Sequence, residues 1–289
     1  MQFYFFALYF FVYGFLGWCT EVGYAATQQG KFVNRGFLNG PICPVYGIGV
    51  GVVVQFLTPV EDHLLLLYLS STILVTLIEG FTGYLMDKIF HHKWWDYSNR
   101  PLNIGGYVCL SFSLVWGAAC VMIVKLIHPM IHKGLSFIPV TIGVVLIITL
   151  GIGLFADLYV TASGILKMNR RLEAMEKIAA ELRELSDKVG ENIYENVMDT
   201  IEFREEKKEQ LDSAAEELRE DIRERMEEQK ARMEKVKAHM EELRIRYEEM
   251  AENRTRVGER LVKAFPGMES RLHKEILEEL KERVKNARK

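Results

Sequence analysis

Three carboxylates, Glu21, Glu79 and Asp157, lie inside hydrophobic segments that are long enough to cross a lipid bilayer. A carboxylate at that depth is energetically costly unless it faces a cavity or a partner. The chemistry open to such a group is to bind a cation, to exchange a proton, or to act as a general acid or base. The three carboxylates therefore mark a candidate binding site.

A loop rich in glycine and proline follows the first hydrophobic segment. The density of these residues from Gly30 to Gly47 predicts unusual backbone turns instead of a helix. Asn34 and Arg35 lie in this loop. We expect Arg35 to be the only permanent cation close to the carboxylates, and its guanidinium can satisfy one or two of them through forked hydrogen bonds.

A second loop, residues 88–106, carries Trp94, Trp95, Asp96 and Asn103. The tryptophans suit the aromatic belt at a membrane interface, so loop anchoring and ligand binding both remain open for them. Anchoring alone does not explain the aspartate and the asparagine. The predicted binding set contains no catalytic residue and comprises Glu21, Asn34, Arg35, Glu79, Trp95, Asp96, Asn103 and Asp157.

Hydrophobic segments must position these residues, and about 20 apolar residues cross a hydrocarbon core of about 30 Å. We predict an all-α, polytopic membrane domain with five spans, at residues 3–25, 43–58, 64–87, 107–127 and 137–163. The second span is the shortest and is rich in glycine, so it is expected to be tilted, kinked or partly re-entrant. The first span is too long for the apolar core of a signal peptide, so we expect it to be retained.

Lysine and arginine concentrate in the loops 26–42 and 88–106 and directly after the fifth span. The positive-inside rule then predicts a multi-pass protein of the cell membrane, with the N-terminus outside and the C-terminus in the cytoplasm. All three carboxylates fall in the inner half of the bilayer in this topology.

The chain has 289 residues and a net charge of −3, but its two halves differ in composition. Residues 1–164 hold seven Lys or Arg and seven Asp or Glu, whereas residues 165–289 hold 29 basic and 32 acidic residues. We therefore predict a transmembrane domain over the first range and a cytoplasmic helical region over the second. The near balance of charge argues against a nucleic-acid-binding arm.

Apolar residues in the charged half recur at alternating steps of four and three, which predicts a long coiled coil within a helical rod over 203–262. The seam comprises Ile222, Met226, Gln229, Met233, Val236, Met240, Leu243, Tyr247, Met250, Arg254, Val257 and Leu261, with Leu211, Ala215 and Leu218 upstream. We expect helix breaks at Gly190 and at 265–267, and a final helix over 269–287. An upstream helix of the same chain, a second copy or another protein can pair with the seam.

Several chemistries lack support in the sequence. There is no GxxxxGK[ST] loop, so the chain is not its own P-loop ATPase, and there is no HExxH or GxSxG motif. The four cysteines form no CxxC pair. His128 and His132 have i, i+4 spacing, but we expect Pro129 to interrupt that geometry, and we assign no metal. We expect no cofactor and no enzymatic activity.

Three stretches carry a resemblance to a known family. They read GWxxE over 17–21, NRGFLxGPxCPxYG over 34–47 and WWDYSxxPxNxxGY over 94–107. On these motifs, residues 1–165 resemble the CmpB-like family of bacterial membrane proteins, which is labelled ABC-transporter type IV. The resemblance implies a permease component of a transporter, with a separate P-loop ATPase subunit as its partner.

Three functions remain open at this point. The leading hypothesis is a transporter component with an inward-facing polar cavity lined by Glu21, Arg35, Glu79 and Asp157. The second is a membrane-anchored scaffold whose output is coiled-coil assembly. The third is an intramembrane enzyme that acts on lipid or lipid-linked substrates, and it ranks last because no nucleophile stands out.

Overall fold

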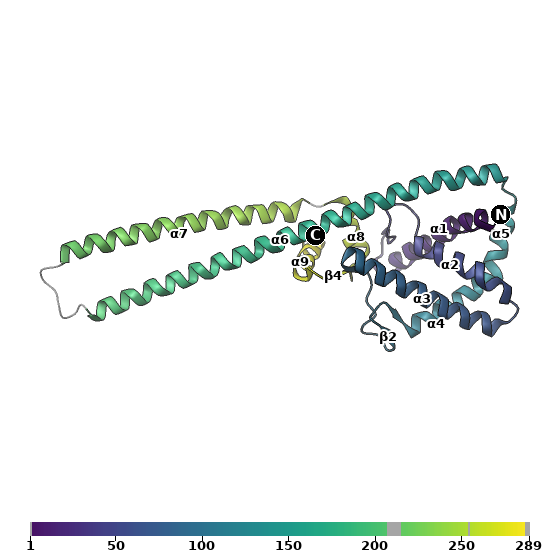
Figure 1. Ribbon diagram of the computed structural model, residues 1–289, viewed down its shortest axis with the longest axis horizontal. Helices are drawn as coiled ribbons and strands as arrows, with labels where there is room; N and C mark the ends of the chain where they lie inside the picture. Colours follow the sequence, from purple (N-terminus) through teal and green to yellow (C-terminus); the bar gives the residue numbers. More distant parts are fainter. Residues whose placement is uncertain (1, 207–214, 254, 287–289) are drawn as a thin grey trace. The chain divides into compact units, whose positions relative to one another are not determined.

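The computed structural model describes residues 2–206, 215–253 and 255–286 (Figure 1). The chain divides into two compact units: residues 1–169 together with 255–289 form the first, and residues 170–254 form the second. The fold is all-α, as predicted, with two small antiparallel ladders of two-residue strands. The end of the chain therefore belongs to the same compact unit as the apolar helices.

The described residues contain four helices that are long and apolar enough to cross a membrane. They are α1 (Gln2–Gln29), α3 (Leu64–Phe90), the run Leu110–Ser136, and the apolar first part of α6 (Val140–Glu206). The second of the five predicted spans forms only a short helix, α2 (Pro44–Leu57), which ends in the 3₁₀ turn η1 (Thr58–Val60). Its 14 residues extend about 21 Å, less than the hydrocarbon core of about 30 Å. Four of the five predicted spans are thus helices long enough to cross a membrane, and the second is a helix too short to do so.

The short helix α2 begins beside the middle of α1. The Cys43 backbone N–H donates a hydrogen bond to the Gly14 carbonyl oxygen at 2.9 Å. Close approach of the two helices depends on glycine, because a Cβ on Gly17 would collide with the ring of Tyr46. Residues 31–43 contain no helix and lie against the C-terminal half of α1. The second predicted span, 43–58, is therefore the short helix α2, and the non-helical segment before it lies in the predicted loop.

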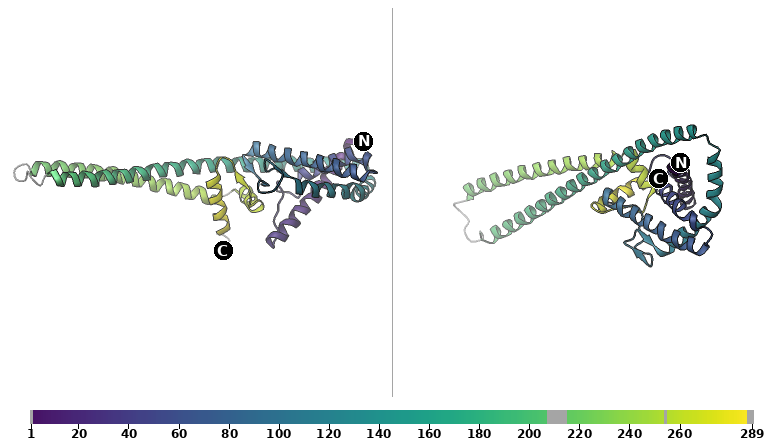
Figure 2. Two further views of the ribbon diagram at one scale, coloured as in Figure 1. Left: turned by 90° about the horizontal axis from the view of Figure 1, so that it is seen from below. Right: turned by 45° about the vertical axis from the view of Figure 1, so that its right-hand side comes forward.

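The buried core of the bundle combines aromatic and aliphatic side chains from several helices, among them Tyr9, Leu67 and Val124. Helix α4 (Leu110–Met122) runs side by side with α3 in both views of Figure 2. Large apolar side chains of α6, such as Phe155, remain exposed. Exposed apolar side chains along a helix of this length suit contact with lipid.

A π-helical turn, η2 (Ile123–Ile127), joins α4 to α5 (His128–Ser136). Proline is tolerated in the first turn of a helix because its missing N–H needs no partner there. The expectation that Pro129 separates the two histidines is therefore wrong. His128 and His132 lie on one helix, and each forms a hydrogen bond with a tyrosine hydroxyl of α1.

The C-terminal segment forms α8 (Arg256–Ala264), the strand β4 (Glu269–Ser270) and α9 (Lys274–Asn286). Strand β4 pairs antiparallel with β1 (His92–Lys93), which follows α3 directly. The predicted break at 265–267 is confirmed. The final helix begins at Lys274 instead of the predicted residue 269, because residues 269 and 270 form β4 and pair with β1.

In the second unit, the C-terminal part of α6 and helix α7 (Ala215–Glu252) run antiparallel (Figure 1). The predicted break at Gly190 is wrong, because α6 continues through it. A single glycine costs a helix only about 1 kcal/mol, which the rest of a long helix can offset. The predicted rod over 203–262 is also interrupted, because Thr255 caps the start of α8 by accepting a hydrogen bond from the Gly258 N–H.

The predicted coiled-coil seam is buried unevenly along α7. Leu243 is buried and Tyr247 is partly buried, whereas Met226 is 65% exposed. The seam positions from 211 to 222, and Arg254, lie outside the residues whose side chains the structure describes. The coiled coil therefore stays a prediction.

Candidate functional site

One hydroxyl and one cation hold Glu21. Its Oε1 accepts a hydrogen bond from the Tyr46 hydroxyl at 2.7 Å, and its Oε2 lies 3.4 Å from Arg35 Nε. The Arg35 guanidinium also stacks on the ring of Tyr24, 4.6 Å from the centroid. Arg35 reaches Glu21 from the loop that returns along α1, and Tyr46 reaches it from the first turn of α2.

Glu79, on α3, has a buried oxygen with no hydrogen-bond partner among the residues described. Its Oε1 accepts a hydrogen bond from the Tyr97 hydroxyl at 3.4 Å, whereas its Oε2 is the unpaired atom. Burial raises the pKa of Tyr97, and the charge of Glu79 raises it further, so this phenol remains a neutral donor. Glu21 and Glu79 both act electrostatically on Tyr46 and Tyr97. The structure thus brings these two carboxylates into one cluster.

Asp157, on α6, accepts hydrogen bonds from the first loop. Its Oδ1 accepts from the backbone and side-chain N–H groups of Asn39 at 3.1 and 2.8 Å, and its Oδ2 accepts from the Gly40 N–H at 2.6 Å. The Thr161 hydroxyl adds a further bond to Oδ1 at 3.2 Å. Non-helical backbone at membrane depth must have its N–H groups satisfied. The geometry of Asp157 therefore favours holding the loop in place.

Arg35 is not the only permanent cation near the carboxylates, contrary to expectation. Arg260, on α8, interacts electrostatically with Asp157. Its Nη1 and Nη2 donate to the carbonyl oxygens of Gly36 and Phe37 at 2.8 and 2.7 Å. The sequence did not reveal this residue because it is one of many similar arginines and lysines in the charged half.

Asn34 connects the first loop to α1. Its Oδ1 accepts from Trp18 Nε1 at 2.8 Å and from the Gly36 N–H at 3.1 Å, and its Nδ2 donates to the Asn39 carbonyl oxygen at 2.7 Å. These three bonds use both ends of the side-chain amide. Asn34 therefore has a clear structural role in shaping the loop.

Asp96 is surrounded by donors of the second loop. Its Oδ1 accepts from Lys93 Nζ at 2.6 Å and from the backbone N–H and hydroxyl of Ser98 at 2.9 and 2.6 Å. Burial alone would raise the pKa of Asp96, but these hydrogen bonds outweigh burial and lower the pKa to about 2. The carboxylate is therefore charged and already partnered at neutral pH.

Trp95 and Asn103 also bind within the second loop. Trp95 Nε1 donates to the Tyr107 carbonyl oxygen at 2.8 Å, and the side chain of Asn103 bonds to three backbone groups. The strands β2 (Asn103–Ile104) and β3 (Val108–Cys109) pair across the same turn. Like Asp96, both residues fix the shape of the loop.

Sequence reasoning missed an ion pair between Asp87, at the end of α3, and Arg271 of the C-terminal segment. Nε and Nη2 of Arg271 donate to the Asp87 carboxylate at 3.0 and 2.8 Å, and the Tyr107 hydroxyl donates to the same group at 2.6 Å. The hydrogen bond to Asp87 raises the pKa of Arg271. Nearby, His92 Nε2 lies 2.6 Å from Asn169 Oδ1, and burial lowers the pKa of His92. Asp87 was visible as an acid at the end of a span, but nothing in the sequence pointed to its partner.

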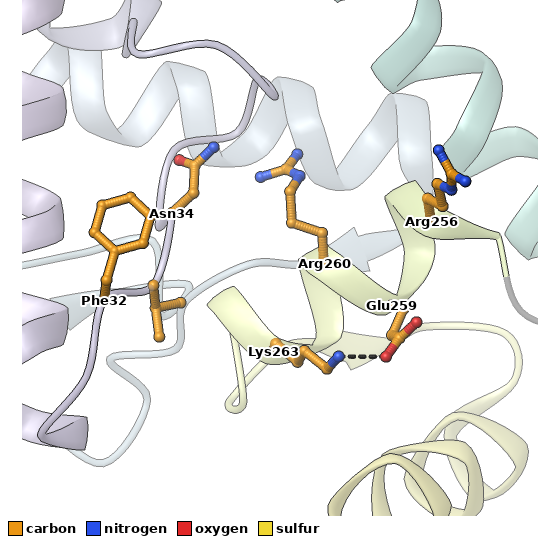
Figure 3. Close-up of a pocket in the computed structure, with 7 residues that line it drawn as sticks. Phe32, Asn34, Arg256, Glu259, Arg260 and Lys263 are labelled. Atoms are coloured by element: carbon orange, nitrogen blue, oxygen red, sulfur yellow. Dashed lines mark hydrogen bonds and ion pairs between the residues drawn. The ribbon is translucent and has the colours of Figure 1, made fainter. Parts of the chain in front are cut away.

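A pocket of about 330 Å³ lies between the first loop and α8 (Figure 3). Of the eight predicted site residues, it contains Asn34 alone, and its other lining residues are Phe32, Val33, Arg256, Glu259, Arg260 and Lys263. No group of three or more residues suited to hold a metal occurs in the part of the chain that the structure describes. The predicted cavity between the intramembrane carboxylates stays a prediction.

Comparison with known proteins identifies a family. A family model described as "Putative ABC-transporter type IV" matches residues 8–162, from α1 into the apolar part of α6. Neither a curated protein nor a solved structure matches the chain. The match covers more than half of the 289 residues and includes both loops and all three intramembrane carboxylates. The chain therefore belongs to the family of ABC-transporter type IV membrane proteins that this model describes.

Proposed function

We propose that this chain is the membrane-embedded permease component of an ABC-type transporter, and that a separate P-loop ATPase subunit drives it. Family membership supports the transporter assignment, and four long apolar helices supply a membrane-embedded body. The sequence lacks a P-loop, so ATP hydrolysis falls to the partner and this chain performs no catalytic step. The proposed topology places the N-terminus outside and the C-terminus in the cytoplasm.

The environment of Glu79 is the observation that carries the proposal furthest. Glu79 lies well inside α3, and its buried Oε2 has no partner within the described structure. Asp157 and Asp96 are already satisfied by several donors each. A carboxylate that stays incompletely paired at membrane depth is expected to hold a proton or a cation. In our proposal Glu79 performs this exchange, and Arg35 compensates the charge of Glu21.

The discontinuous segment beside this cluster supports the same assignment. Helix α2 starts next to the middle of α1, and Tyr46 in its first turn binds Glu21. Short helices that begin inside the membrane commonly form the substrate and ion sites of transporters, because their free backbone ends face a cavity. The inward-facing cavity of our proposal lies at the start of α2, between Glu21 and Glu79.

The first experiment tests the partner. The full chain is purified from native membranes in a mild detergent, and co-purifying proteins are identified by mass spectrometry together with the native mass of the particle. The proposal predicts a stoichiometric P-loop ATPase subunit. A particle that contains only copies of this chain would contradict the permease assignment.

The second experiment tests Glu79 without knowledge of the substrate. Dicyclohexylcarbodiimide reacts with protonated carboxyl groups in apolar surroundings, and peptide mass spectrometry locates the adduct. We expect labelling at Glu79 and none at Glu21, whose two oxygens are held by Tyr46 and Arg35. Glu79→Gln should abolish the label, whereas Glu61→Gln, the same change outside the helices, should leave it unchanged. Equal labelling of Glu21, or none at Glu79 at any pH, would exclude the proposed exchange.

One observation favours a scaffold as the second candidate function. In the second unit, apolar side chains of Tyr194 and Met198 on α6 and of Met226 on α7 are exposed. Apolar residues at helical spacing seldom remain uncovered, so they suit a second helix pair. A scaffold predicts that Met226→Glu lowers the oligomer mass measured by light scattering. The transporter hypothesis predicts that the Met226→Glu variant still co-purifies with the same amount of the ATPase subunit.

A further inference from the structure

The pocket beside the first loop has a surplus of positive charge. Three cations line it, Arg256, Arg260 and Lys263, and all come from α8. Its one acid, Glu259, forms an ion pair with the lysine. In Figure 3, Arg260 points toward the first loop while Glu259 and Lys263 face each other. A pocket with this balance of charge attracts an anion.

The sequence of α8 explains why the cations gather on one side. Arg256, Arg260 and Lys263 follow i, i+4, i+7 spacing, which places them in one row along the helix. The neighbouring row, Val257 and Leu261 followed by Ala264, packs inward, and a Cβ on Gly164 of α6 would meet the valine at 2.7 Å. Packing of the apolar row therefore fixes the direction in which the basic row points.

Arg260 is the anchored member of the basic row. Its two terminal nitrogens bind the carbonyl oxygens of Gly36 and Phe37, and its buried Nε has no partner among the described residues. The guanidinium is thus held in place by the loop before any ligand arrives. Arg256 is exposed and Lys263 is partly exposed, so these two side chains remain accessible.

The position of the pocket identifies the kind of anion. Phe32 lines the pocket three residues after the end of α1 at Gln29, and it is 70% exposed. The end of a spanning helix lies at headgroup depth, and an exposed phenylalanine there can enter the boundary of the acyl chains. Anionic phospholipids of the cytoplasmic leaflet bind basic pockets at this depth. We propose that Arg256, Arg260 and Lys263 bind the phosphate of an anionic phospholipid headgroup, with Phe32 against its glycerol and upper acyl chain.

This inference goes beyond the proposed transport function and rests only on its topology, with the C-terminus in the cytoplasm. The test uses the full chain in detergent micelles and native mass spectrometry, with titrations of palmitoyl-oleoyl phosphatidylglycerol, palmitoyl-oleoyl phosphatidylcholine and inorganic phosphate. Each basic residue near a membrane surface contributes about fivefold in affinity, so Arg256→Gln with Lys263→Gln should weaken phosphatidylglycerol binding about 25-fold. Arg260 is left unchanged because it holds the first loop.

The matched control removes the same charge from α9, outside the pocket, by Lys274→Gln with Lys285→Gln. We expect this control to keep the affinity of the wild type, and both double variants to keep its thermal midpoint. The proposal would be overturned if the α9 control lost as much phosphatidylglycerol affinity as the pocket variant. It would also be overturned if the wild type bound phosphatidylcholine as tightly as phosphatidylglycerol. Binding of inorganic phosphate without a preference for phosphatidylglycerol would overturn the lipid assignment.

Discussion

The ion pair between Asp87 and Arg271 gives the sharpest test of how the C-terminal segment is held. The Asp87 side chain is 10% exposed and the Arg271 side chain is 48% exposed, and two guanidinium nitrogens bind the carboxylate at 3.0 and 2.8 Å. Hydrogen bonds to charged groups contribute about 1.5–3 kcal/mol each. Solvent around the half-exposed arginine screens the pair, so we expect Arg271→Gln to cost about 2 kcal/mol in all.

Hydrogen–deuterium exchange of residues 255–286 measures this cost directly. A loss of about 2 kcal/mol raises the open fraction of a locally unfolding segment about 30-fold, since about 1.4 kcal/mol corresponds to a factor of ten. Lys274→Gln is the matched control, because that lysine lies in the same segment, is mainly exposed, and meets Glu269 only at 3.5 Å. The control should stay within a factor of about three, as expected for a surface pair.

A double-mutant cycle separates the pair from other effects of the substitution. Asp87→Asn and Arg271→Gln together should cost clearly less than the sum of the two single changes, because each removes the same interaction. Unchanged protection in Arg271→Gln, or strictly additive effects in the cycle, would refute the inference that this pair holds the C-terminal segment on α3.

Three further predictions follow from the packing and the polar contacts of the first unit. Gly17→Ala should lower the thermal midpoint of unfolding by several degrees because the new Cβ meets the ring of Tyr46 on α2. The control Gly23→Ala has nothing within 4 Å and should leave the midpoint unchanged, so equal midpoints for the two variants would contradict the close packing. Burial lowers the pKa of His92, which lies on β1 opposite β4, so His92 binds a proton more readily once the C-terminal segment has opened. Docking is therefore complete above about pH 6.5 and weakens as the pH falls below it; exchange of residues 255–286 that does not increase between pH 7.5 and pH 5.5, after correction for intrinsic rates, would argue against this linkage. Asp157→Ala should free the first loop and raise the rate at which maleimide labels the buried Cys43 about tenfold or more, whereas an unchanged rate would mean that the carboxylate does not hold the loop.

Hydropathy alone located the apolar helices, but it did not show that the second one is too short to cross the membrane. The segment 43–58 is apolar enough to resemble a span, and it is helical over nearly the same residues, but α2 has only 14 residues and begins beside the middle of α1. The high density of glycine and proline indicated the irregular backbone of residues 31–43 before it. Where that backbone would go depended on acceptors such as Asp157, which lies far away along the chain.

The candidate site was predicted in part. Residue type and depth identified Glu21 and Glu79, and in the structure Glu21 accepts a hydrogen bond from Tyr46 and Glu79 accepts one from Tyr97. The same reasoning grouped Asp157 with them, although it binds the backbone of the first loop. Carboxylates with different partners look alike in a hydropathy pattern, because only tertiary contacts decide which donors reach them.

The sequence by itself determined the helical class, the position of the long apolar helices and the family. These features rest on composition, on local periodicity and on motifs within short stretches. The tertiary structure alone decided that the C-terminal segment returns to the membrane unit, through Arg260 on the first loop and Arg271 on Asp87. Both arginines are ordinary members of a charged helical region, and pairing between distant residues depends on how the chain folds back, which no local pattern encodes.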